Sequence, residues 1–172
     1  MIRSYRGQQP KIHRSAYVDP SAQVIGRAEI GARASVWCNV TIRGDVNSIR
    51  IGEETNIQDN SCLHVDRDAP LRLGERIVVG HSVTLHGCEI ENDCLIGMSA
   101  TVLSGAKIGA GSIVAAGSLV LERAEIPPRS LVMGAPAKVK RETTEGERAA
   151  VRRNAQSYVD LSREYLEELK AD

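Results

Sequence analysis

A six-residue rhythm runs through residues 90–126, which read IENDCLIGMSATVLSGAKIGAGSIVAAGSLVLERAEI. Each unit begins with an aliphatic residue and carries a small residue four positions later. The aliphatic positions are Ile90, Ile96, Val102, Ile108, Val114, Val120 and Ile126, and the small positions are Cys94, Ala100, Ala106, Ser112, Ser118 and Ala124. A period of six fits neither an α-helix nor an alternating strand. It predicts a solenoid in which each hexad is a short strand followed by a corner.

The same frame extends towards the N-terminus. Its aliphatic positions there are Ile12, Val18, Val24, Ile30, Val36, Ile42, Ile51, Ile57 and Leu63. Three hexads would make one triangular coil, and roughly six coils would stack into a prism about 30 Å tall at the ~4.8 Å spacing of neighbouring strands. A glycine often follows the aliphatic residue, where a tight corner tolerates little side chain, as at Gly31, Gly52, Gly74, Gly80, Gly97 and Gly109. We place the end of the repeat at Pro127–Pro128.

Composition supports this architecture and narrows the function classes. The 172 residues are 42 % hydrophobic but only 3 % aromatic, with no Phe, as thin triangular layers require. The 22 basic and 22 acidic residues balance, which argues against a nucleic-acid or membrane-surface binder. No signal peptide or membrane-spanning run is visible, and the four cysteines form no CxxC pair. We therefore expect a cytoplasmic protein whose cysteines are small core residues.

A different pattern follows the repeat. Thr144 and Glu147 form a T-x-x-E capping box, which predicts a helix that continues to about Lys170 and lies along the prism. The apolar stripe that we expect to pack is Val151, Ala155, Tyr158, Leu161, Tyr165 and Leu169. We read Tyr158 and Tyr165 chiefly as packing residues, with Tyr158 also a possible pocket residue. The chain thus divides into a β-helix domain at 1–141 and a C-terminal helix at 142–172 that packs on the same domain.

The repeat is interrupted in the middle, and three of the four histidines lie there. His64 and His86 are separated by one coil plus about four loop residues, which predicts one face, adjacent layers and a shared metal. His81 precedes His86 by one hexad, on the adjoining face, and points away from the other two within one subunit. A threefold trimer would bring a neighbour's His81 into range. Three neutral imidazoles with one open position are typical of a catalytic zinc site. We expect His13 to be an ordinary surface residue.

Five short motifs in these interrupted coils are specific as a set. They are Arg43-Gly44-Asp45, Asn56-Ile57-Gln58-Asp59-Asn60, Leu63-His64-Val65, Val79-Gly80-His81 and Leu85-His86-Gly87-Cys88. Together they resemble the γ-class carbonic anhydrases, which are hexapeptide-repeat proteins, and the resemblance covers nearly the whole chain. It implies an all-β solenoid, a left-handed parallel β-helix, with a C-terminal α-helix packed along it. The handedness comes from this resemblance, because the period alone does not determine it.

The resemblance also implies a reaction and a metal. His64, His81 and His86 would bind Zn²⁺, with Fe²⁺ or Co²⁺ as other possibilities, and His81 would reach the metal across the interface of a homotrimer. The reaction would be the reversible hydration of CO₂ to bicarbonate by a metal-bound hydroxide, because a metal lowers the pKa of its water to about 7. We expect neither a nucleic-acid nor a membrane partner.

The remaining polar residues of the motifs receive roles in the same way. Arg43 and Asp59 would form an ion pair between subunits, and Asp45 would help to hold that interface. Gln58 and Asn56 would orient the metal-bound water and the incoming CO₂, and Arg43 would favour bicarbonate. Purely structural roles stay open for all five: interface pairing for the charged residues, and a polar ladder along the sheet for the two amides.

The chain departs from the best-characterised γ enzymes at their proton-transfer residues. Val46 stands where those enzymes carry a glutamate, and the loop at 66–70 is too short to hold their second one. Asp66 and Asp68 are possible substitutes. The chain therefore resembles the short, acidic-loop-lacking subgroup, and the native metal and the proton shuttle stay open.

Three other functions compete with this one. The first is a CoA-dependent acyltransferase, which would use a single histidine as general base; the segment Met133–Lys138 is shared by both groups. The second is an acyl-CoA thioesterase that uses the same metal-bound water. The third is a trimer that binds the metal without catalysis.

Overall fold

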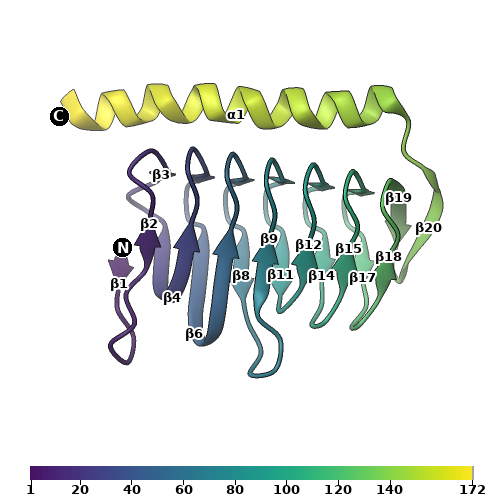
Figure 1. Cartoon of the computed structure of the whole chain (residues 1–172), viewed down its shortest axis with the longest axis horizontal. Coiled ribbons are helices and arrows are strands. Elements are labelled where there is room, and N and C mark those ends of the chain that lie inside the picture. The colour runs from purple at the N-terminus through teal and green to yellow at the C-terminus, as the bar shows by residue number, and fades with distance from the viewer. Residues whose placement is uncertain (172) are drawn as a thin grey trace.

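The aliphatic positions of the repeat form one continuous column inside the solenoid. In the computed structural model, which describes residues 1–171, Ile42, Leu63, Leu85 and Val102 lie in register on successive strands and are fully buried. The result is a left-handed parallel β-helix with one helix laid along its side (Figure 1). The expected fold class is confirmed.

We name the three faces of the prism for what they carry. The helix face comprises β3 (Tyr17–Val18), β5 (Ser35–Val36), β7 (Asn56–Ile57), β10 (Val78–Val79), β13 (Leu95–Ile96), β16 (Ile113–Val114) and β19 (Ser130–Gly134), with β20 (Ala137–Glu142) antiparallel at its edge. The histidine face comprises β1 (Ile2–Arg3), the first parts of β4 (Gln23–Ile30) and β6 (Thr41–Ile51), β8 (Cys62–His64), β11 (Thr84–His86), β14 (Thr101–Val102) and β17 (Leu119–Val120).

The third face, here called the charged face, comprises β2 (Lys11–Ile12), the second parts of β4 and β6, β9 (Leu71–Leu73), β12 (Glu89–Ile90), β15 (Lys107–Ile108) and β18 (Glu125–Ile126). Strands β4 and β6 turn the corner between the histidine and charged faces, so those two faces form a single 12-stranded sheet. In Figure 1 the charged face is at the front and α1 (Glu145–Ala171) lies above the prism.

The corner glycines are required by the close stacking of coils. A Cβ added to Gly52 would lie 2.2 Å from the carbonyl oxygen of Gly74, and one added to Gly97 would lie 2.5 Å from the amide nitrogen of Ala116. Neither glycine has a positive φ. Backbone proximity, and not a left-handed conformation, therefore excludes a side chain at these two positions.

The repeat continues beyond Pro127–Pro128, contrary to our expectation. Strand β19 pairs in parallel with β16 and buries Val132 completely. Val132 lies in the 18-residue coil frame of Val114, so the period was present in the sequence. The two prolines occupy a corner, where no N–H is needed for the sheet, and therefore do not end the solenoid.

Helix α1 begins as predicted, but it buries a partly different face. Thr144 Oγ1 accepts from the Glu147 amide at 3.2 Å, and Glu147 Oε2 accepts from the Thr144 amide at 2.8 Å, which completes the capping box. The buried stripe is Val151, Ala155, Val159 and Ser162. Leu161 and Leu169 are 38 % and 47 % exposed, so the expected stripe is wrong at these two positions, whereas Tyr158 and Tyr165 (41 % exposed) pack against Trp37. Residue size misled the prediction; helical spacing from Val151 selects Val159 and Ser162.

Four of the five aromatic side chains, Tyr17, Trp37, Tyr158 and Tyr165, gather where α1 meets the first coils. Trp37 lies 5.1 Å from Tyr17, 5.6 Å from Tyr158 and 5.1 Å from Tyr165 between ring centroids. Edge-to-face contacts of this kind stabilise packing. The packing interpretation of Tyr158 and Tyr165 is confirmed.

The expectation for the four cysteines is met by only two of them, and the expectation for His13 is met. Cys88 and Cys94 are buried core residues as expected, whereas Cys38 is half-buried and Cys62 is exposed. His13 is an exposed residue that contacts Ser15. Within residues 1–171, no helix combines the length and the apolar character needed to cross a membrane. The last residue of the expected 142–172 segment lies outside the described residues.

Candidate metal centre

His64 and His86 lie side by side on the histidine face. They are register partners at the ends of β8 and β11, and the buried Leu63 and Leu85 that precede them anchor both strands in the core. Side chains alternate between the two sides of a strand, so the imidazoles project outward from adjacent layers. His64 Nδ1 lies 3.1 Å from His86 Nε2. The predicted juxtaposition of these two histidines is present.

The other nitrogen of each ring is held by an oxygen of a neighbouring coil. His64 Nε2 lies 3.0 Å from Asp45 Oδ1, and His86 Nδ1 lies 2.8 Å from Ser104 Oγ. Such outer contacts fix the orientation and the tautomer of a ligating imidazole. Each ring therefore has one nitrogen fixed by protein and one turned towards the other ring.

Asp45 is held in its ionised form. Burial alone would raise its pKa, but hydrogen bonds from His64, Arg43 and the amide of Val46 lower the pKa of this carboxyl to about 2. An ionised carboxylate only accepts hydrogen bonds, so His64 carries its proton on Nε2 and presents a lone pair at Nδ1. Asp45 thus determines which nitrogen of His64 faces His86.

The pair suits a metal ion in both spacing and chemistry. Two nitrogens bound at about 2.0–2.1 Å to one tetrahedral zinc lie about 3.3 Å apart, within a few tenths of an ångström of the 3.1 Å observed. His86 can donate from Nδ1 to Ser104, which frees its Nε2 lone pair. The residues present therefore fit two of the three imidazole ligands of a zinc-type site.

His81 lies on a different edge of the same chain. It follows β10 of the helix face, and its Nδ1 lies 2.9 Å from Asp59 Oδ2. Its side chain is 45 % exposed, and its Nε2 makes no hydrogen bond within the described chain. No cluster of three His, Cys, Asp or Glu residues suited to a metal forms within residues 1–171. A single chain therefore brings together His64 and His86 but not His81.

The charged residues beside the histidines have partners within the chain. Arg43, the register neighbour of His64, forms its ion pair with Asp45. Asp59 contacts His81 and not Arg43. The pairing of Arg43 with Asp59 across subunits is not formed within one chain and stays a prediction, as does the interface role of Asp45.

The two amide residues lie near the edge that carries His81. Asn56 is fully buried and Gln58 is 6 % exposed, and Gln58 Nε2 donates to Asn56 Oδ1 over 3.1 Å. Asn56 Nδ2 has no hydrogen-bond partner within the described chain. Asn56 sits on β7 beneath α1, so only Gln58 has any surface to offer a small molecule.

Two further contacts complete the surroundings. Burial, and then the negative charge of Asp59, raise the pKa of Tyr158, whose ring lies 5.6 Å from that of Trp37 between centroids. Ser104 was not among the predicted residues. Its separation from His86 is 18 residues, one full coil, and this spacing was the signal that could have found it.

Comparisons with known proteins assign the chain to a family. A family model described as "Bacterial transferase hexapeptide (six repeats)" matches residues 87–122. A probable carbonic anhydrase of Methanocaldococcus jannaschii is 45 % identical, with 92 % of this chain and 99 % of that protein covered. A carbonic anhydrase of Geobacillus kaustophilus is 41 % identical, with 96 % and 91 % covered. The chain belongs to the γ-class carbonic anhydrase family.

Other members of the γ-class carbonic anhydrase family are longer. Gamma carbonic anhydrase 2 of Arabidopsis thaliana mitochondria is 38 % identical, and the chain spans 60 % of its length. Among solved structures, a provisional acetyltransferase of Bacillus cereus has a TM-score of 0.94 at 41 % identity, with 95 % of each chain covered. A hexapeptide transferase family protein of Anaplasma phagocytophilum has a TM-score of 0.91 at 37 % identity, with 94 % and 96 % covered.

Proposed function

We propose that the protein catalyses the reversible hydration of CO₂ to bicarbonate at a metal site shared between the subunits of a homotrimer. The observation that carries the proposal is the 3.1 Å approach of two imidazole nitrogens whose outer nitrogens are each held by oxygen. The third ligand is His81 of a neighbouring subunit, because His81 lies apart from the other two within one chain. Three imidazoles leave one position of a tetrahedral metal open.

The metal would be Zn²⁺, Fe²⁺ or Co²⁺, all of which accept imidazole ligands. When bound, such a metal supplies a water of lowered pKa at neutral pH. His64 and His86 would hold it, with their ring orientations fixed by Asp45 and Ser104. Asp59, 2.9 Å from His81 Nδ1, would fix the orientation of the His81 ring in the same way.

The other residues act on the substrate. Gln58 is positioned by the buried Asn56, and we assign it the orientation of CO₂ at the His81 edge. The exposed guanidinium of Arg43 lies in register with His64 and favours the bicarbonate anion that forms. We also assign Tyr158, whose pKa is raised by burial and by the charge of Asp59, to the pocket.

A mixing experiment tests the shared site directly. His81→Ala and His86→Ala homotrimers should both lack metal and show no CO₂ hydration above buffer in stopped flow, after reconstitution with Zn²⁺ or, anaerobically, Fe²⁺. Unfolding and refolding the two variants together in equal amounts should restore about one quarter of the wild-type sites, because every mixed trimer contains one complete interface.

Each possible result is decisive. One tightly bound metal per chain in His81→Ala would exclude the shared site. Restored metal content without CO₂ hydration would keep the site and reject the reaction. Recovery in the mixture but in neither variant alone is the expected outcome.

Acyl transfer is the second candidate, and the name of the similar Bacillus cereus structure favours it. A CoA-dependent acyltransferase would work with a single histidine base and without the metal. A thioesterase would share the metal with the anhydrase. Assays of metal-free and metal-loaded protein on acetyl-CoA, with and without an acceptor amine, separate these two activities from CO₂ hydration.

A further inference from the structure

A column of charged side chains crosses the charged face, one residue per coil. Its members, in register order, are Lys11, Glu29, Arg50, Arg72, Glu89, Lys107 and Glu125. Opposite charges on neighbouring strands attract, and like charges repel. The signs alternate along the column except at one step, where Arg50 lies directly beside Arg72.

The Arg50–Arg72 step is not neutralised by the chain. Neighbouring strands lie about 4.8 Å apart, so the two guanidinium groups share one patch of surface. Among the described residues, no carboxylate oxygen lies within ion-pair distance of either side chain, whereas Arg33 and Arg76 on other coils each contact two acidic residues. The fold therefore retains a like-charge step between Arg50 and Arg72.

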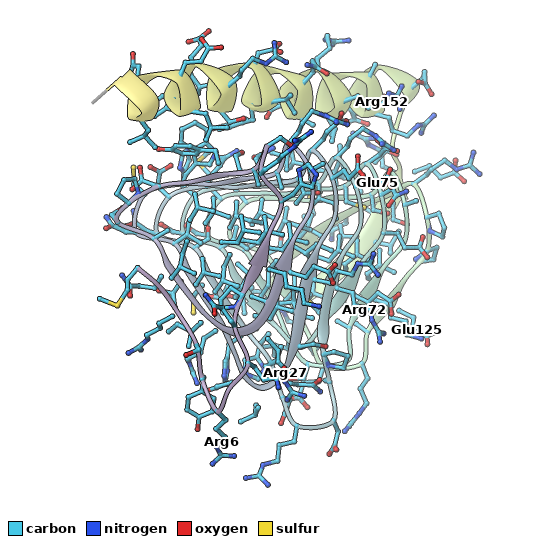
Figure 2. All side chains as sticks on the ribbon, turned by 60° about the vertical axis from the view of Figure 1, so that its left-hand side comes forward. Arg6, Arg27, Arg72, Glu75, Glu125 and Arg152 are labelled. Atoms are coloured by element: carbon cyan, nitrogen blue, oxygen red, sulfur yellow. The ribbon has the colours of Figure 1, made fainter. Side chains whose placement is uncertain are left out.

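A cavity of about 330 Å³ opens at this step. Four cations line it, Lys11, Arg27, Arg50 and Arg72, with Glu29 as the single carboxylate. Gln8, Gln9 and Ser48 add amide and hydroxyl groups, and the buried Ala28 and Ile49 lie at its base. Figure 2 shows Arg27 and Arg72 on the side of the solenoid away from α1. The cavity combines a net charge of +3 (four cations less one carboxylate) with neutral hydrogen-bonding groups.

We propose that this cavity binds a small polyanion of the diphosphate class. Guanidinium groups present paired N–H donors that match phosphate oxygens, and such charge-assisted bonds are stronger than neutral ones. A ligand with two or more negative charges would neutralise Arg50 and Arg72 together, which a single carboxylate could not do. The charged face carries none of His64, His81 and His86, so this inference stands independently of the proposed reaction.

The test uses the full-length protein and inorganic pyrophosphate as the probe. Isothermal titration in low-salt buffer should give saturable binding of one pyrophosphate per chain, and the affinity should fall as salt is added. Replacing both Arg50→Gln and Arg72→Gln should weaken binding about tenfold or more, because two charge-assisted contacts are lost. The matched control, Arg123→Gln with Arg153→Gln, changes the net charge equally at exposed arginines elsewhere and should bind within about twofold of wild type.

Pyrophosphate also chelates metals, so the titration is repeated on His86→Ala. Binding that disappears in His86→Ala and persists in Arg50→Gln/Arg72→Gln would place the ligand at the histidines and overturn the proposal. Equal weakening by both arginine pairs would reduce it to general charge attraction and also overturn it. In addition, the unliganded Arg50→Gln protein should melt close to wild type, since the substitution removes the repulsion from Arg72 together with the attraction to Glu29; a clear loss of stability would assign Arg50 a structural role instead.

Discussion

The coils between Ile42 and Ile90 and those between Ile90 and Ile126 are built on the same core but carry different surfaces. On the histidine face, the outward position that follows each buried aliphatic residue forms one column across both regions. From β4 to β17, its members in register order are Ile25, Arg43, His64, His86, Leu103 and Leu121. Within this part of the column, the polar residues lie between Ile25 on one side and Leu103 and Leu121 on the other.

The difference lies in the corners and not in the core. Strands β8 and β11 run one residue further than β14 and β17, and that extra residue is His64 or His86. A longer connection, 65–70, follows β8, whereas only Gly87 and Cys88 separate β11 from β12. Asn47 Nδ2 holds the 66–70 loop by donating to the carbonyl oxygens of Asp66 and Arg67. A solenoid accepts such insertions because its ladders and inward residues are unchanged. The two histidines therefore lie where a strand extends one residue further into the corner than it does in the regular coils.

Converting one region into the other should have the largest effect. His86→Leu gives the middle column the residue that the next coil has at Leu103, so the fold should persist. Metal content and CO₂ hydration should fall to background, because one imidazole ligand is lost. Elemental analysis and stopped flow measure the two. A variant that kept both would show that His86 is no ligand.

Truncating a core side chain should lower the free energy of unfolding by the same amount in both regions. Leu85 and Ile108 are each at most 1 % exposed, so Leu85→Ala and Ile108→Ala should each destabilise the protein by about 2–5 kcal/mol. Urea unfolding at one fixed protein concentration measures this. A much larger loss for Leu85 would mean that the middle coils rely on the core more than the regular ones do.

Removing an outer contact should have a smaller effect, confined to the middle coils. Ser104→Ala should weaken metal binding about 10- to 100-fold, because His86 loses the partner that selects its tautomer. Ser104→Thr keeps the hydroxyl and should restore most of the affinity, and Ser4→Ala is the control at an exposed serine. Competition with a chelator gives the affinities; equal values for Ala and wild type would remove Ser104 from the site.

Removing the helix cap should have the smallest effect on stability, and this effect should be the same for both regions. Thr144→Ala should lower the free energy of unfolding by about 1 kcal/mol through loss of the N-cap. Metal affinity should not change. A loss of metal together with stability would indicate that α1 positions the His81 edge.

The same cap predicts a pH dependence with a definite sign. The hydrogen bond from Arg141, followed by that from the Thr144 amide, lowers the pKa of Glu147 from 4.5 to about 2. Its stabilising effect is complete above pH 4.5 and is lost as the pH falls towards 2. The stability difference between wild type and Glu147→Gln should thus be constant from pH 7 to 5 and shrink below that. A difference that persisted unchanged at pH 3 would contradict this assignment.

Local patterns carried most of the fold prediction. The six-residue frame located the strands, and the T-x-x-E box located the start of α1. The errors arose where a local signal competed with packing. Pro127–Pro128 looked like an end but fills a corner, and large apolar residues on α1 looked like a buried stripe although Val159 and Ser162 occupy it.

The sequence by itself determined the coil, the helix and the pairing of His64 with His86, because a fixed period places residues one coil apart next to each other. Only the tertiary structure decided which nitrogens face each other, that Asp45 and Ser104 hold the opposite nitrogens, and that Arg50 stands beside Arg72 over a cavity. These contacts join residues of different coils whose register depends on the insertions between them. A one-dimensional period states that two residues are neighbours, but the direction of each side chain is determined by the packing around it.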